Sequence, residues 1–60
     1  MYFKRSDKVK HDDLGEFMII QQNELSFFNE SLPRFDIENI ETGDVIKGGY
    51  LYNGSWKIIK

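Results

Sequence analysis

Residues 45–60, which read VIKGGYLYNGSWKIIK, carry the strongest local structural signal in this sequence. Asn53-Gly54 lies between two runs that are rich in β-branched and aromatic residues. This dipeptide is typical of a type I′ turn, because both central positions of that turn need positive φ. A two-residue turn also fixes how the flanking strands pair. The sequence therefore predicts a terminal β-hairpin over 45–60 in which Leu51 faces Trp56.

The predicted hairpin has two distinct faces, because successive side chains of a strand point to opposite sides. One face, with Leu51, Trp56 and Ile58, is expected to belong to the hydrophobic core. The pair Gly48-Gly49 favours a β-bulge that bends the strand. The opposite face is expected to be exposed and holds Tyr50, Tyr52, Ser55 and Lys57.

Several segments upstream also have strand or turn character. Residues 16–22 contain the apolar run FMII and predict a buried strand. Residues 35–40 favour a short strand or a single turn, and the sequence TGD at 42–44 favours a turn before the hairpin. Residues 2–5 predict a short first strand, and the polar stretch 6–15 predicts a loop.

Residues 24–32 fit two structures. Leu25, Phe28 and Leu32 have helical spacing, whereas Leu25 and Phe27 alternate as in a strand. Pro33 ends whichever element precedes it. The sequence therefore leaves helix and strand open for this segment.

Composition agrees with β structure. The 60 residues include no alanine, the best helix former, and many β-branched and aromatic residues. There is no cysteine, so no disulfide stabilises the chain, and its length allows one domain over 1–60. We predict a mainly β fold, or an α+β fold with one short helix. Its expected form is a small antiparallel sheet or an open barrel of the SH3 type.

Charge is distributed unevenly along the chain. The formal net charge is −2, but residues 12–44 carry nine carboxylates and one arginine, while residues 1–11 and 45–60 are each basic. Such segregation favours contact with a charged partner. In an antiparallel fold, the two basic ends of the chain are expected to lie beside each other.

Little in the sequence favours catalysis or a bound metal. His11 is the only histidine, and we expect it to be an exposed loop residue. Zinc needs about four ligands rich in nitrogen and sulfur, which one histidine and no cysteine do not supply. A calcium loop of the EF-hand type beginning at Asp36 fails because Ile40 occupies its fifth position. The sequence has no phosphate-binding loop and no nucleophile elbow, so we expect no enzyme, cofactor or metal.

We therefore expect a small non-catalytic protein that binds a larger partner with a basic surface and regulates or inhibits it. The acidic segment 12–44 is the expected contact, and the tyrosine face contributes to it. Amino-acid usage rich in isoleucine, lysine and asparagine points to an AT-rich source, such as a phage or mobile element. The predicted partner-binding residues are Tyr50, Tyr52, Lys57, Glu38, Glu41 and Asp44.

Two alternative functions stay open. A small barrel that binds nucleic acid would stack bases on Tyr50 and Tyr52 and contact phosphate through Lys57 and the N-terminal cations. A structural or assembly subunit would form a homo-oligomer. The longest apolar run has four residues, far fewer than the roughly 20 of a membrane helix, and residues 1–10 lack the apolar part of a secretory signal. We therefore expect a cytoplasmic protein without a membrane partner.

Overall fold

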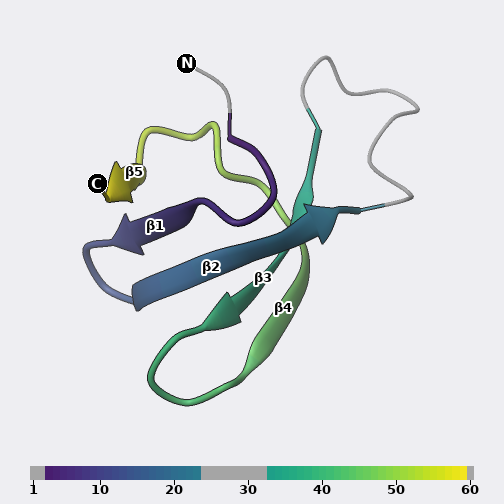
Figure 1. The fold of residues 1–60 in the computed structure, drawn as a ribbon. Helices are drawn as coiled ribbons and strands as arrows, with labels where there is room; N and C mark the ends of the chain where they lie inside the picture. Colours follow the sequence, from purple (N-terminus) through teal and green to yellow (C-terminus); the bar gives the residue numbers. More distant parts are fainter. Residues whose placement is uncertain (1–2, 24–32, 60) are drawn as a thin grey trace.

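In the computed structural model, residues 3–23 and 33–59 are described, and they form an open five-stranded antiparallel sheet (Figure 1). The strand order across the sheet is β4-β3-β2-β1-β5. No helix occurs within these described residues. The prediction of a small, mainly β protein is confirmed. The strands are β1 (Lys8–His11), β2 (Gly15–Gln22), β3 (Phe35–Asn39), β4 (Val45–Gly49) and β5 (Trp56–Ile59).

The central strands form where the sequence predicts them. β2 covers the expected strand at 16–22, and β3 forms the short strand that was one of the two alternatives, strand or single turn, for 35–40. Residues 42–44 lie in the connection from β3 to β4, as predicted. Residues 24–32, for which helix and strand stayed open, lie outside the described residues.

The predicted terminal hairpin over 45–60 is wrong. β4 pairs with β3, and β5 pairs with β1, so these two strands lie at opposite edges of the sheet. Gly54 has φ +86°, but Asn53 does not have the positive φ that a type I′ turn needs. Instead, the Asn53 side-chain Oδ1 accepts a hydrogen bond from the Ser55 N–H at 3.0 Å. Asn53-Gly54 thus forms a local side-chain-capped turn within a longer connection.

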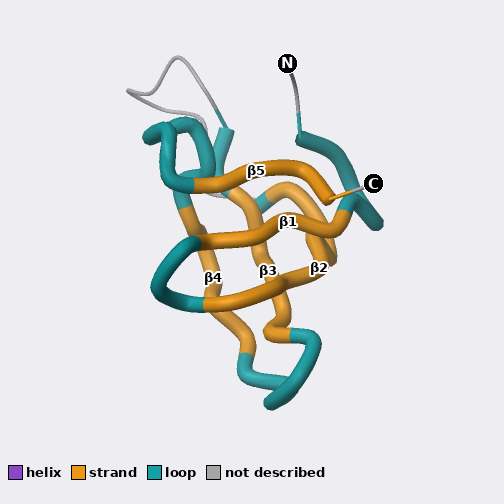
Figure 2. The backbone as a smooth tube through the Cα atoms, turned by 90° about the vertical axis from the view of Figure 1, so that its left-hand side faces the viewer, coloured by secondary structure: helices purple, strands orange, loops and turns teal. Residues whose placement is uncertain are grey.

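The connection from β4 to β5 crosses one face of the sheet, because it joins opposite edges (Figures 1 and 2). Leu51 is buried in the core at 1% exposure, and the adjacent Tyr52 also packs against the core. Two consecutive side chains facing the core do not fit the alternation of a strand. This packing explains why residues 50–55 leave the sheet and do not extend β4 into a hairpin.

The N-terminal expectations are also wrong. Residues 3–5 are not in a strand; a turn forms there, in which the Asp7 N–H donates to the Lys4 carbonyl at 3.1 Å. The predicted loop 6–15 contains β1. That strand has only one buried apolar residue, Val9, whose neighbours on both sides are lysines. Because most of its residues are polar, the sequence did not indicate this strand. β1 nevertheless pairs with β2 on one side and with β5 on the other.

The hydrophobic core lies on one face of the sheet. Trp56, Ile58 and Phe3 pack around it together with Tyr52, so the expected core role of Leu51, Trp56 and Ile58 is confirmed, although no hairpin places them. Among residues 3–23 and 33–59, no layer covers the opposite face of the sheet, which we call the open face. The buried core residues are Val9, Phe17, Ile19, Phe35, Ile37 and Leu51.

Two irregularities bend the sheet at the end far from the β1–β2 turn. The register of β2 on β3 shifts between Ile19 and Gln21, and that of β3 on β4 shifts between Phe35 and Ile37. Gly48, with φ +69°, lies in the second shift, where a residue with a Cβ would be strained. The predicted bulge at Gly48-Gly49 is therefore confirmed.

Candidate binding surface

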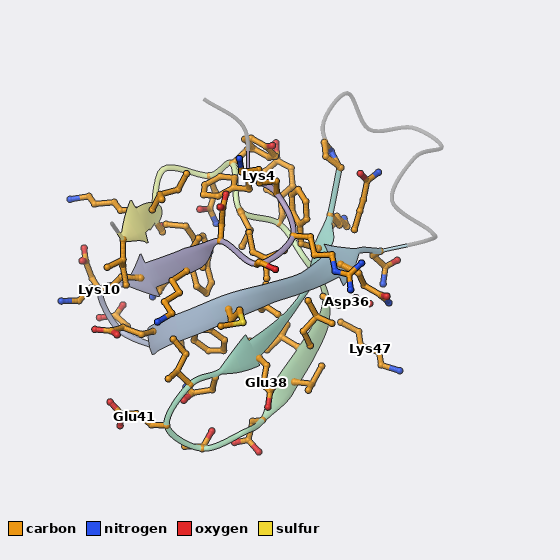
Figure 3. All side chains as sticks on the ribbon, in the orientation of Figure 1. Lys4, Lys10, Asp36, Glu38, Glu41 and Lys47 are labelled. Atoms are coloured by element: carbon orange, nitrogen blue, oxygen red, sulfur yellow. The ribbon has the colours of Figure 1, made fainter. Side chains whose placement is uncertain are left out.

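Two acidic turns meet at one end of the sheet. The β1–β2 turn (12–14) and the β3–β4 turn (40–44) lie side by side because β2 and β3 are antiparallel neighbours. The Ile40 N–H donates to the Glu16 carbonyl at 3.0 Å, and Asn39 Nδ2 donates to the Leu14 carbonyl at 3.4 Å. Figure 3 shows Glu38 and Glu41 on the lower side of the molecule, away from Lys4. We call this region the acidic end; its carboxylates are Asp12, Asp13, Glu16, Glu38, Glu41 and Asp44.

The β3–β4 turn is held by Asn39. Its side-chain Oδ1 accepts hydrogen bonds from the N–H groups of Glu41 (2.8 Å) and Thr42 (3.0 Å). The Gly43 N–H donates to the Asn39 carbonyl at 2.8 Å, and Thr42 Oγ1 donates to the Asp44 carboxylate at 3.1 Å. The Glu41 side chain makes no such bond and is exposed. The turn therefore presents Glu41 on a fixed backbone.

The β1–β2 turn is held by His11. Its Nδ1 accepts hydrogen bonds from the N–H groups of Asp13 (3.0 Å) and Leu14 (3.1 Å). The ring packs edge-on against Trp56, with 4.8 Å between centroids. His11 is thus a half-buried strand end that shapes the turn, and the expectation of an exposed loop residue is wrong. No group of three metal-ligating side chains occurs in the described parts of the chain.

Two exposed apolar side chains lie among the carboxylates. Leu14 is 50% exposed and Ile40 is 45% exposed. Neither was predicted from the sequence as a binding residue. The available signal was their position, since each is an isolated large apolar residue in or beside a polar turn. The acidic end therefore combines negative charge with apolar contact area.

The predicted tyrosine face does not form as a hairpin face. Tyr52 packs on Phe3 with 5.0 Å between ring centroids, and its Oη accepts a hydrogen bond from the Phe3 N–H at 3.3 Å. Tyr50 lies 6.1 Å from the Tyr52 ring, and its own ring is 5.5 Å from the Arg34 guanidinium. Lys57 alternates with the core residues of β5 and points to the open face. The structure thus places Tyr52 and Lys57 on opposite sides of the sheet; a binding role for the three residues stays a prediction.

The basic ends of the chain lie beside each other, as expected. Lys10 of β1 is directly opposite Lys57 of β5, and Lys8 lies two residues along β1 on the same face. All three side chains are exposed. Like charges directly opposite each other on neighbouring strands repel. We call these three residues the lysine strip.

Asp36 lies apart from the acidic end and is buried at 6% exposure, near Lys47 (Figure 3). Its carboxylate accepts hydrogen bonds from Asn23 Nδ2 (2.8 Å), Gln21 Nε2 (2.8 Å) and the Gly48 N–H (3.0 Å). The bonds from Asn23 and Gln21 hold the pKa of Asp36 below its ordinary value, against the opposing effect of burial. Asp36 thus joins the two irregular ends of β2 and β4 and is a structural carboxylate.

Comparison with known protein families, curated proteins and solved structures finds no match to this chain. No helix in residues 3–23 and 33–59 is long and apolar enough to span a membrane. The fold and its surfaces define a small β protein with an open antiparallel sheet. One end of that sheet is acidic, and one edge of its open face is basic.

Proposed function

We propose that this protein is a non-catalytic binding module that uses its acidic end to contact a basic surface of a larger protein and so regulates or inhibits it. The observation that supports the proposal most directly is the meeting of the two acidic turns around exposed Leu14 and Ile40. Charged groups around an apolar centre give both steering and contact area to an interface.

The rigidity of the turns adds to this proposal. Asn39 and His11 hold the backbones of the two turns, so little conformational entropy is lost when the exposed side chains are contacted. Small proteins that present charge on rigid turns gain association rate from long-range attraction, which weakens as salt increases. Binding to the partner should therefore be salt-sensitive.

Reversing charge at the acidic end is expected to weaken partner binding at least tenfold while the fold persists. The variant combines Asp12→Lys and Glu41→Lys, because both side chains are exposed and make no hydrogen bond that holds a turn. Tagged protein is used to capture partners from a nuclease-treated lysate of a low-GC bacterium. We expect a stoichiometric partner with wild-type protein, and a loss of at least tenfold with the variant, since like charges across an interface cost several kcal/mol.

The control variant is Lys4→Glu with Arg5→Glu, which replaces two exposed cations outside the acidic end. Lys4 lies on the side of the molecule away from Glu41 (Figure 3). It should retain the partner. Glu38→Lys and Asp44→Lys are measured separately, because Glu38 also belongs to the open face and Asp44 accepts a bond within its turn. Equal retention by wild-type protein and the Asp12→Lys/Glu41→Lys variant would contradict the proposed contact.

The lysine strip favours a second candidate function, the binding of single-stranded nucleic acid. Lys8, Lys10 and Lys57 converge on two adjacent strands, and closely spaced cations bind phosphates. This function predicts binding to a fluorescent oligonucleotide at low salt and a steep loss of affinity as salt rises. Lys10→Glu should weaken that binding, and Glu41→Gln should not. The absence of binding at about 20 mM salt would exclude this candidate.

A further inference from the structure

The face of the sheet opposite the core has no layer over it within the described residues. Met18 and Ile20 of β2 are exposed at 39% and 37%, and Val45 of β4 is exposed at 49%. Three large apolar side chains on one face of so small a domain favour association. Domains of this size often gain stability by oligomerisation, because their own core is small.

The strand register places these apolar residues in an ordered row. Lys8 is opposite both Met18 and Ile59, and Glu38 is opposite both Met18 and Val45. Read across the open face from β5 to β4, the row is Ile59, Lys8, Met18, Glu38 and Val45. It is apolar at the centre and at both ends, with a cation on one side of Met18 and an anion on the other.

We propose that this open face packs against the same face of a second copy of the chain, around a two-fold axis that runs along β2. A two-fold axis exchanges the two sides of the row. Lys8 of each copy then lies over Glu38 of the other, Ile59 lies over Val45, and Met18 meets Met18. Two sheets packed face to face with nearly aligned strands satisfy this geometry. The row is therefore complementary to itself in both charge and polarity.

The neighbouring row supports the same arrangement. It contains Lys57, Lys10 and Glu16, and the Glu16 carbonyl accepts the bond from Ile40 at the start of the acidic β3–β4 turn. The two-fold axis brings Lys10 and Lys57 of one copy over that turn of the other, which relieves the repulsion between these two lysines. Because Glu16 lies on β2, the axis brings it close to Glu16 of the other copy. Lys10 of the same chain lies directly beside Glu16 and offsets this repulsion.

The dimer shares the acidic β3–β4 turn with the proposed function, so a second copy and a partner would compete for it; the inference is therefore tested with the full chain and no partner. Sedimentation equilibrium from about 10 µM to 1 mM, a range suited to a weak interface, should show a mass rising from 7.1 kDa toward twice that value. Met18→Asp should weaken association at least tenfold, because it places two carboxylates at the apolar centre. Circular dichroism checks that each variant remains folded.

The decisive experiment uses two single charge reversals. Lys8→Glu alone and Glu38→Lys alone should each weaken association about tenfold or more, because each homodimer then opposes like charges twice. An equimolar mixture of the two variants should associate as well as wild-type protein, since both cross-chain contacts are again between opposite charges. Lys8 and Glu38 flank Met18 within one chain and are not paired, so an effect inside one chain does not produce this rescue.

Two results would overturn the inference. One is a wild-type protein that dimerises while the mixture of variants does not, which would move the interface to another face. The other is a wild-type protein that stays monomeric at 1 mM.

Discussion

Replacing Phe17 by alanine is expected to unfold most of the protein at 25 °C. Phe17 is 3% exposed in the middle of β2, and its ring packs edge-on against Trp56 with 5.3 Å between centroids. Truncating a buried phenylalanine costs about 3–5 kcal/mol, because apolar burial is lost and a cavity is left. A domain of this size has a total stability of only about 3–9 kcal/mol. The loss is therefore comparable with the whole free energy of unfolding.

Urea denaturation followed by tryptophan fluorescence measures this loss, and Met18→Ala provides a matched control. Met18 is the next residue of β2 but points to the open face, so its truncation should cost less than about 1 kcal/mol in the monomer. Dilute protein keeps self-association out of the comparison. Similar losses for the two variants would contradict the assignment of the core to the Phe17 face.

Asp36→Asn is expected to destabilise the protein by about 2–3 kcal/mol at neutral pH. The carboxylate accepts bonds from Asn23, Gln21 and the Gly48 N–H, and an amide would place an NH₂ group against at least one of these donors. A buried donor left without an acceptor costs more than the net value of one hydrogen bond. The loss should appear as a lower urea midpoint with an unchanged slope.

The same carboxylate makes stability depend on pH. Because the pKa of Asp36 is lower in the folded than in the unfolded protein, its ionisation stabilises the fold above the ordinary value, near pH 4. That contribution is lost as pH falls from about 4 through the folded-state pKa. Urea midpoints between pH 2.5 and 7 should therefore fall steeply in acid for wild-type protein, and less steeply for Asp36→Asn.

Asp13→Asn is the matched control for this pH dependence. Asp13 is exposed in the β1–β2 turn, and only its backbone N–H makes a hydrogen bond. Its substitution should leave both the stability at neutral pH and the fall of the urea midpoint in acid close to those of wild-type protein. If the urea midpoint of Asp36→Asn fell in acid as steeply as that of wild-type protein, other groups would cause the pH dependence.

Local patterns predicted the centre of the sheet well. Residues 16–22 combine an apolar run with polar flanks and were recognisable as a strand. The short alternation at 35–39 repeats every two residues, but so short a segment left a single turn open as well. The bulge at Gly48-Gly49 was predictable because only glycine accepts the positive φ at position 48 without strain. Each of these features depends on neighbours within a few residues.

The candidate site was only half predictable. Sequence showed that carboxylates concentrate in 12–44, including Glu38, Glu41 and Asp44. It did not show that the turns at 12–14 and 40–44 meet, because this depends on the pairing of β2 with β3. Leu14 and Ile40 become candidate binding residues only because these two turns lie side by side.

The sequence by itself determined a small β protein with an acidic middle and basic ends, because strand propensity, bulge chemistry and charge are properties of single residues and close neighbours. Tertiary structure decided which strands pair. The turn at Asn53-Gly54 favours a hairpin by a small local energy, whereas burial of Leu51 and Tyr52 against the core gains more from a connection that crosses the sheet. Long-range burial therefore overrode the local turn, placed β5 beside β1, and brought the lysines to one edge and the acidic turns to one end.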